Sequence, residues 1–252
     1  MNKVINFTPA RLSCAACGFS DLCLPHGLKK EDWKLLDEVV QQEYTLGKGE
    51  SLFSAGQPFK SLFAVHSGSI KSFILSNDGE EQIIGFHMPG DLLGFDALAD
   101  DMYSCTAVAL ETCSVCEIPI KSLQNLCVKV PDLGKHIMML MSQQITAQHE
   151  MMLMLAKKSA EVRLATLLLN ISSRFHVRGF SAQQYHLSMS RHDIGNYLGL
   201  AVETVSRLLT HLHEVNIIQV DRRYIKIRDM HRLQQLAQQV EFDVTHVKRM
   251  AD

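Results

Sequence analysis

The sequence predicts an α+β chain in which a β-rich amino-terminal half precedes a long helix and a small helical domain with a β-hairpin. Three observations lead to this prediction. Short β-type runs alternate with glycine-bearing turns from Tyr44 to about Ile120, helical periodicity dominates after Pro131, and residues 190–213 have helix-turn-helix spacing. The 252 residues are enough for one large or two ordinary domains whose core needs no disulfides.

Composition predicts a cytoplasmic chain that does not enter membranes. The first residues lack the apolar run of a secretory signal, and no stretch approaches about 20 apolar residues. In a reducing compartment, clustered cysteines bind metal or sense redox state more often than they form bridges, and the odd total of seven agrees. From Ala160 onward, twelve Lys and Arg residues face nine Asp and Glu, which permits contact with phosphate at this end of an otherwise acidic chain.

The amino-terminal half divides into two predicted parts. Residues 1–28 form a segment that contains three cysteines, and residues 29–130 form a domain that begins with an amphipathic helix over 29–42. Short strands at regular spacing with glycine turns predict a β-barrel or β-roll for the rest of this domain. The clearest strand-like runs are Leu62–His66, Ile70–Leu75 and Gln82–His87.

Residues 131–158 are predicted to form one long helix with a strongly apolar face. Two interpretations fit this face: an ordinary buried core helix, or a seam that pairs two subunits of a homodimer. Methionine is frequent along it, and flexible polarizable side chains suit an interface that repacks. The dimer-interface residues predicted on this face are Ile137, Met141, Ile145, Gln148, Met152 and Leu155.

Residues 159–252 are predicted to form a winged helix-turn-helix domain. Ser190 followed by Asp193 is a capping-box-like helix start. Gly195 permits close helix crossing, and Gly199 supplies the backbone freedom of a tight turn. The predicted apolar wedge between the two helices consists of Ile194, Leu198, Val205 and Leu208.

The second helix of this motif presents residues suited to reading DNA. Glu203, Ser206 and Arg207 share one exposed face, where Arg donates to guanine and Glu accepts from cytosine. The alternative is a solvated Glu–Arg pair of little consequence. Beyond the helix, Arg222 and Arg223 lie at the turn of a predicted β-hairpin wing, where they are expected to hold phosphates.

A β-roll, a long helix and a winged helix-turn-helix in this order resemble the superfamily of cyclic-AMP-receptor and fumarate–nitrate-reduction regulators of bacteria. The resemblance covers nearly the whole chain, and residues 90–94 match the glycine-acidic element of its cyclic-nucleotide-binding jelly roll. Cyclic-nucleotide-binding members follow this element with an arginine that binds the phosphate. Here the next fifteen residues contain three aspartates and no arginine, so no cyclic nucleotide is expected to bind.

The cysteines near the amino terminus have the spacing C-x2-C-x5-C at Cys14, Cys17 and Cys23. Three close thiolates can serve iron–sulfur or zinc, and spacing alone does not decide between them. The stretch 12–25 resembles the ligand loop of the fumarate–nitrate-reduction branch, which implies a [4Fe-4S] cluster with Cys116 as fourth ligand. Cys105, Cys113 and Cys127 compete for that role, and Gly18 and Leu22 are expected to control access to the cluster.

The resemblance implies an oxygen-responsive transcription regulator. In that branch, the intact cluster favours a homodimer that binds double-stranded DNA at a TTGAT…ATCAA-like palindrome and contacts RNA polymerase. Oxygen converts the cluster towards [2Fe-2S] and then causes its loss. No motif of a nucleotide-binding, zinc-protease or serine-hydrolase site is present, so no enzyme is predicted. The alternatives are a zinc-stabilised regulator of the same superfamily and an iron–sulfur redox protein.

Overall fold

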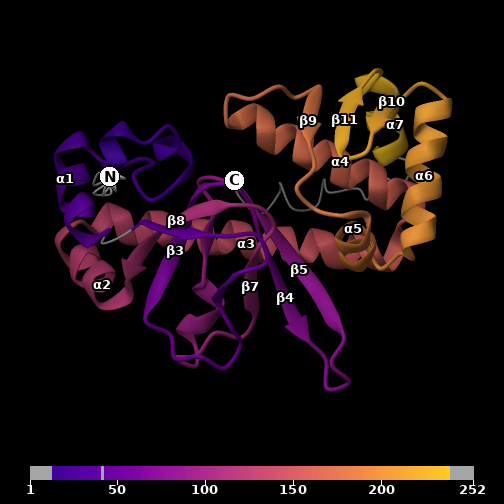
Figure 1. The fold of residues 1–252 in the computed structure, drawn as a ribbon. Coiled ribbons are helices and arrows are strands. Elements are labelled where there is room, and N and C mark those ends of the chain that lie inside the picture. Colours follow the sequence, from indigo (N-terminus) through magenta and orange to yellow (C-terminus); the bar gives the residue numbers. More distant parts are fainter. Residues whose placement is uncertain (1–12, 41–42, 239–252) are drawn as a thin grey trace, which may run out of the picture. The chain divides into compact units, whose positions relative to one another are not determined.

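The computed structural model describes residues 13–40 and 43–238 (Figure 1). The predicted amino-terminal segment before Ser13, and the last part of the predicted winged domain, residues 239–252, lie outside the described residues. The chain divides into two compact units, one up to Thr146 and one from Ala147. Figure 1 shows strands at the centre of the first unit and mostly helices in the second, which confirms the predicted α+β class.

The amino-terminal segment contains two short 3-10 helices, Cys14–Ala16 and Ser20–Leu22, followed by helix α1, Lys30–Val39. Helix α1 begins with acidic residues in its first turn, which interact favourably with the positive end of the helix dipole. It ends earlier than the sequence predicts, at Val39. Leu36 is its fully buried residue and fixes it to the core of the first unit.

The β-roll consists of two four-stranded antiparallel sheets, with strand orders β1-β8-β3-β6 and β2-β7-β4-β5. The predicted roll is therefore confirmed. A glycine at position 68 is required between β3 and β4, because its φ is +75° and a Cβ there would lie 2.6 Å from the Thr112 carbonyl oxygen. The strands are β1 Glu43–Leu46, β2 Ser51–Phe53, β3 Ser61–Ser67, β4 Ile70–Leu75, β5 Glu81–His87, β6 Leu92–Leu93, β7 Thr106–Ala109 and β8 Cys113–Pro119, with a 3-10 helix at Phe95–Leu98.

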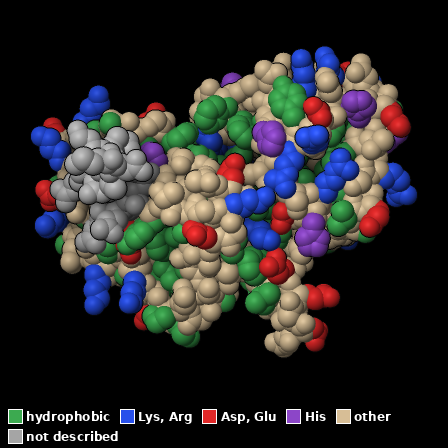
Figure 2. All heavy atoms as spheres, in the orientation of Figure 1, with side chains coloured by type: hydrophobic (Ala, Val, Ile, Leu, Met, Phe, Trp, Pro, Cys, Tyr) green, Lys and Arg blue, Asp and Glu red, His purple; other side chains and the backbone are tan. Residues whose placement is uncertain are grey.

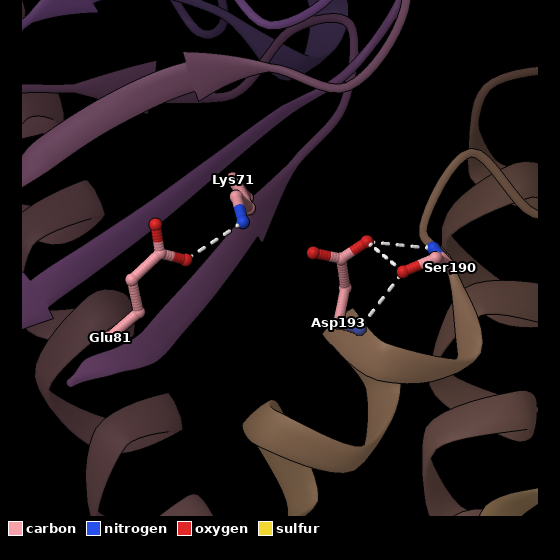
Figure 3. A network of polar contacts seen from close by, with 4 residues as sticks. All are labelled: Lys71, Glu81, Ser190 and Asp193. Carbon is pink, nitrogen blue, oxygen red and sulfur yellow. Dashed lines mark hydrogen bonds and ion pairs between the residues drawn. The ribbon is translucent and has the colours of Figure 1, made fainter. Parts of the chain in front are cut away.

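The roll closes around a core of aliphatic and aromatic side chains. Phe53 stacks on Tyr103 with ring centroids 4.0 Å apart, and the buried Tyr103 hydroxyl donates to the Ser61 carbonyl at 2.7 Å, so no polar atom of this ring is left unpaired. On the surface of the β4–β5 pair, Lys71 and Glu81 form an ion pair at 3.1 Å (Figure 3). The Glu81 carboxylate is exposed and Lys71 is half-buried, and a pair that is partly open to solvent in this way adds little stability.

Two helices lead out of the roll. Helix α2, Ile120–Lys129, packs beside α1 at one end of the roll and was not predicted (Figure 1). The predicted long helix is present as α3, Pro131–Lys157, and proline at its first position suits a helix start because no intrahelical partner is lost there. Leu133 of α3 is fully buried in the core of the roll.

The second unit contains helices α4, Ala160–Val177, α5, Arg191–Leu198, α6, Val202–Glu214, and α7, Met230–Gln238. Its sheet has the order β10-β11-β9, formed by Ile218–Asp221, Tyr224–Ile227 and Gln184–His186. The predicted helix-turn-helix and wing are present, whereas α7 was not predicted. Among the described residues, no helix is both long and apolar enough to cross a membrane.

Candidate cysteine-lined metal site and nucleic-acid interface

The cysteine loop, residues 13–26, is bound at its start by a carboxylate of α1. Asp37 accepts a hydrogen bond from the Ser13 hydroxyl at 2.6 Å and another from the backbone N–H of Cys14 at 2.6 Å. The Ser13 oxygen in turn accepts from the Ala15 N–H at 3.2 Å and caps the first 3-10 helix. These bonds fix the position of Cys14 relative to α1.

The end of the cysteine loop is bound by a histidine of α3. The carbonyl oxygen of Cys23 lies 3.1 Å from Nε2 of His136 and 3.1 Å from the backbone nitrogen of His26. The His26 and His136 rings lie with centroids 5.4 Å apart, and the neighbouring Leu24 is fully buried in the core. Burial lowers the pKa of His136, which keeps the imidazole neutral at pH 7.

The middle of the loop lies against Gly90, in the turn between β5 and β6. A Cβ at Gly90 would lie 2.9 Å from Cβ of Leu22 and 3.6 Å from Cβ of Phe19, and the φ of this residue is +92°. Glycine is therefore required here both by the backbone conformation and by the approach of the loop. Asp91 holds the turn by accepting from the Met88 N–H at 2.8 Å.

Four cysteines line one cavity of about 40 Å³: Cys14, Cys17 and Cys23 of the loop, and Cys116 of β8. The other lining residues include Phe19, Leu24, His66 and Ile118, so much of the wall is apolar. In the described parts of the chain, no three His, Cys, Asp or Glu side chains are grouped closely enough to hold one metal ion. As a donor set, four thiols around one cavity match the all-cysteine ligation of iron–sulfur clusters and of structural zinc.

The surroundings of Cys14 and Cys23 oppose the ionisation of these two thiols. Burial raises the pKa of Cys23 to about 12, with smaller contributions from Cys116 and Asp91 in the same direction. Burial likewise raises the pKa of Cys14, and the carboxylate of Asp37 adds to that effect. Because the thiolate is the metal ligand, these thiols depend on a bound cation to stabilise their charged form.

The three competing cysteines lie outside the lining of this cavity. Cys113, on β8, is fully buried, and Cys105 is buried beside Asp96, whose carboxylate accepts from the Ser104 N–H at 3.3 Å. Burial and this carboxylate together raise the pKa of Cys105 to about 12. Cys127 lies on α2. Asp96 is exposed just after Gly94, so the segment that contains no arginine for a phosphate carries negative charge instead.

The helix-turn-helix is built from contacts within its own residues. The Ser190 N–H donates to Asp193 Oδ2 at 2.8 Å and the Asp193 N–H donates to Ser190 Oγ at 3.1 Å, which is a complete capping box (Figure 3). A Cβ at Gly195 would lie 2.6 Å from the Leu200 carbonyl oxygen, and Gly199 has φ +62°. The buried wedge is Ile194, Leu198, Val205 and Leu209. Leu209 thus takes the place that the sequence assigned to Leu208, which is half-buried.

The predicted DNA-reading residues lie on the accessible side of α6. Glu203 and Arg207 are exposed and Ser206 is half-buried. On the wing, Arg222 is exposed at the hairpin turn, with φ +53°. Arg223 is half-buried and donates from Nη1 to the Ser188 carbonyl at 2.9 Å, so part of its guanidinium is already bound. Figure 2 shows Lys, Arg and His side chains spread among acidic ones over the visible face of this unit.

The predicted interface residues of α3 differ in their exposure within the single chain. Ile145, Gln148 and Met152 are exposed. Ile137 and Met141 are half-buried and pack against the core of the roll, and Leu155 is half-buried in the second unit. Exposed apolar side chains at Met138 and Met139 extend the outward face of the helix.

Three residues that touch the cysteine loop were not predicted from the sequence: Asp37, Gly90 and His136. The glycine-acidic element did mark Gly90, although in connection with a nucleotide. For Asp37 and His136 no local pattern indicates a partner, because the bonds they form span 24 and 113 residues. Pairwise covariation among related sequences is the signal suited to finding such contacts.

Two family models match the chain: the cyclic nucleotide-binding domain over residues 44–129 and the Crp-like helix-turn-helix domain over residues 162–236. The chain is 48% identical over 216 residues to the transcriptional activator protein FnrA of Stutzerimonas stutzeri, covering 86% of this chain and 88% of that protein. It is 46% identical over 226 residues to the fumarate and nitrate reduction regulatory protein of Yersinia pestis, covering 90% of each. The structure of FixK2 from Bradyrhizobium japonicum matches with a TM-score of 0.72 and 32% identity, over 77% of this chain and 96% of that one.

Proposed function

The chain belongs to the family of FNR and Anr transcription regulators, and from this premise we propose that it senses oxygen through a [4Fe-4S] cluster bound by Cys14, Cys17, Cys23 and Cys116. Like its relatives, it is a regulator with a DNA-binding helix-turn-helix and not an enzyme. The observation that carries the proposal is the cavity that all four cysteines line, three from one loop and one from β8.

The residues around this cavity suit such a cluster. When bound, a [4Fe-4S] cluster would supply oxygen-labile iron–sulfur bonds, which is the chemistry that an oxygen signal requires. The walls formed by Phe19, Leu24 and Ile118 limit the access of water, which strengthens charge interactions inside. The name of the Yersinia pestis relative also supports an oxygen signal, because fumarate and nitrate are electron acceptors that replace oxygen.

The DNA-binding part of the proposal concerns a two-fold palindrome of the form TTGAT…ATCAA. Glu203, Ser206 and Arg207 read base edges in the major groove, and the exposed Arg222 holds phosphate, with Arg223 in a supporting position. A palindrome is read by a protein with two-fold symmetry, which here means a homodimer. We therefore propose the exposed face of α3 as the interface between the two subunits. Ile145, Gln148 and Met152 lie on that face, whereas Ile137, Met141 and Leu155 support it from within each subunit. At promoters the dimer contacts RNA polymerase, and cyclic nucleotide is not its ligand.

The test is a metal assay on anaerobically purified protein. Four single variants, Cys116→Ala, Cys105→Ala, Cys113→Ala and Cys127→Ala, are assayed for iron, acid-labile sulfide and zinc beside the wild type. We expect about four iron and four sulfide per chain in the wild type and in every variant except Cys116→Ala, which loses them. The three other variants are matched controls because each also removes one thiol from the same unit.

Two outcomes contradict the proposal. Zinc without sulfide in the wild type indicates a zinc-stabilised regulator instead. Iron retained in Cys116→Ala and lost in one of the other three variants shows that the fourth ligand is assigned to the wrong cysteine.

A further inference from the structure

The first turns of α3 have two faces with different neighbours. Leu133 and His136 point into the first unit and are 0% and 8% exposed. Met138 and Met139, two and three residues further on, are 64% and 43% exposed. One rigid turn of helix therefore carries both a buried histidine and the beginning of the outward apolar face.

The buried histidine is bound to the cysteine loop through the backbone of a candidate ligand. A carbonyl oxygen only accepts hydrogen bonds, so the 3.1 Å contact between Cys23 O and His136 Nε2 requires the proton on Nε2. The same oxygen accepts from the His26 N–H at 3.1 Å, and the His26 ring lies beside that of His136, tilted by 46° with the ring centroids 5.4 Å apart. Sγ of Cys23 is separated from this carbonyl carbon by only two atoms, Cβ and Cα, so a tilt of the Cys23 peptide displaces the acceptor.

The other end of the loop is bound differently. Asp37 holds Ser13 and Cys14, but it belongs to α1, which packs against the first 3-10 helix and α2. A shift of Cys14 therefore displaces α1 and its neighbour α2 at the end of the roll. A shift of Cys23 is passed directly to α3.

We propose that His136 is the positioning residue that couples the cysteine loop to α3, by holding the Cys23 carbonyl in the geometry that the loaded loop requires. This inference rests on the proposed function, because it takes the four cysteines as cluster ligands and the outward face of α3 as the dimer interface. According to this proposal, binding of the cluster alters the dimer interface of α3 through one hydrogen bond, donated by the buried imidazole of His136 to the Cys23 carbonyl.

A purely structural role for His136 makes a different prediction. A buried histidine that only fills space lowers stability when it is replaced, whether or not the cluster is bound. A coupling residue changes the ratio of the dimer dissociation constants of the cluster-free and loaded forms, because that ratio measures the free energy shared between the two sites.

The experiment measures this ratio by anaerobic sedimentation of the full chain, before and after removal of iron. His136→Leu removes the N–H donor, and His136→Gln keeps a side-chain N–H that is able to reach the same carbonyl. His87→Leu is the matched control, since His87 is a half-buried histidine of the roll that contacts Ser72 Oγ at 2.9 Å and does not line the cavity. Thermal unfolding is recorded for every variant.

We expect His136→Leu to keep iron and sulfide near the wild-type content while the ratio falls at least tenfold towards one. His136→Gln should restore most of the ratio, and His87→Leu should leave it unchanged even where stability falls. A wild-type ratio in His136→Leu overturns the inference, as does His136→Gln behaving like His136→Leu. Loss of iron from His136→Leu also overturns it, because the residue then serves to retain the cluster.

A second measurement needs no variant. Removal of iron from the wild type should change hydrogen exchange at the amides of residues 23–26 and of the first two turns of α3 together. Altered exchange in the loop with unaltered exchange in α3 overturns the inference. A wild type without iron, or with equal dimer constants in both forms, instead contradicts the proposed function.

Discussion

The cysteine loop and the helix-turn-helix are held in place in opposite ways. The helix-turn-helix takes its capping box, its two glycines and its apolar wedge from within residues 190–213. The cysteine loop has only short 3-10 helices of its own and is fixed by Asp37 of α1, Gly90 of the roll and His136 of α3. The helix-turn-helix is thus specified locally, whereas the proposed metal-binding loop is specified by distant parts of the first unit.

This difference indicates at which positions a substitution should affect each of the two elements. Changes inside residues 190–213 should act on the stability and the DNA affinity of the second unit. Changes far from the cysteine loop in sequence should still alter the loop, because its contacts are long-range. A segment with few regular hydrogen bonds is also the kind that opens at low free-energy cost, which suits a region that must respond to a ligand.

The largest effect expected from this comparison is that of Gly195→Ala. The added Cβ would lie 2.6 Å from a backbone carbonyl that cannot move independently, so unfolding of the second unit should become easier by about 3 kcal/mol. Gly134→Ala is the control, since that helical glycine would meet only Cys127 Cβ at 3.8 Å, and alanine should stabilise α3 by up to about 1 kcal/mol. Denaturant unfolding followed by circular dichroism measures both. Equal effects of the two variants would mean that the helix crossing does not need glycine.

Arg207→Ala tests whether the helix-turn-helix reads bases through α6, as distinct from phosphate contacts by the wing. Loss of a base contact should cost about 2 kcal/mol at the preferred site and relax the preference at one base pair. Arg222→Ala, at the exposed wing turn, should weaken all sequences about equally and reduce the slope of log affinity against log salt by about one. Fluorescence anisotropy with cognate and scrambled duplexes at several salt concentrations distinguishes them. A uniform loss for both variants would refute the major-groove assignment of Arg207.

Gly90→Ala tests whether the roll shapes the loop. Alanine at φ +92° costs about 1–2 kcal/mol through its backbone, and its Cβ would also press on Leu22 at 2.9 Å. Gly56→Ala has a similar backbone cost, at φ +80°, with no heavy atom within 4 Å. The loop should therefore become more sensitive to proteolysis in Gly90→Ala than in Gly56→Ala, by roughly tenfold for a difference of about 1.4 kcal/mol in opening free energy. Indistinguishable cleavage rates would show that the contact does not shape the loop.

Ser190→Ala should have the smallest effect of the four, since it removes one capping hydroxyl. The expected loss is about 1 kcal/mol of stability of the second unit. Ser159→Ala is the matched cap of α4, where the Val162 N–H donates to Ser159 Oγ over 3.4 Å, and it should cost less because that bond is longer and has no reciprocal partner. Thermal unfolding compares the two. A larger loss for Ser159→Ala would contradict the view that the capping box stabilises the recognition motif.

The contrast between local and long-range contacts also explains which parts of the structure the sequence predicts well. The helix-turn-helix is predicted nearly in full because its glycines, cap and periodicity are local, and the one exchange, Leu209 for Leu208, is a shift of one residue on a helix face. The short helices α2 and α7 were missed. Helix α2 follows Pro119 without a side-chain cap, whereas α7 has one, since Asp229 accepts from the Arg232 N–H at 2.9 Å, and this start signal was overlooked. The four cysteines were grouped through a family resemblance, since spacing alone left zinc and iron–sulfur open. Asp37 and His136 depend on how distant helices pack, which no local pattern encodes.

The order of synthesis gives the cysteine cavity a further property. Cys116 leaves the ribosome 93 residues after Cys23, and β8 is placed only by pairing with β1 and β3. At translation rates of about 5–20 residues per second, three thiols are therefore made roughly 5–20 s before the fourth. The cysteine loop emerges before β8 but its cavity is completed only with β8, so a cluster of the proposed kind would be inserted after the roll has closed. A chain interrupted before residue 116 carries the triplet of cysteines without the strand that finishes the site.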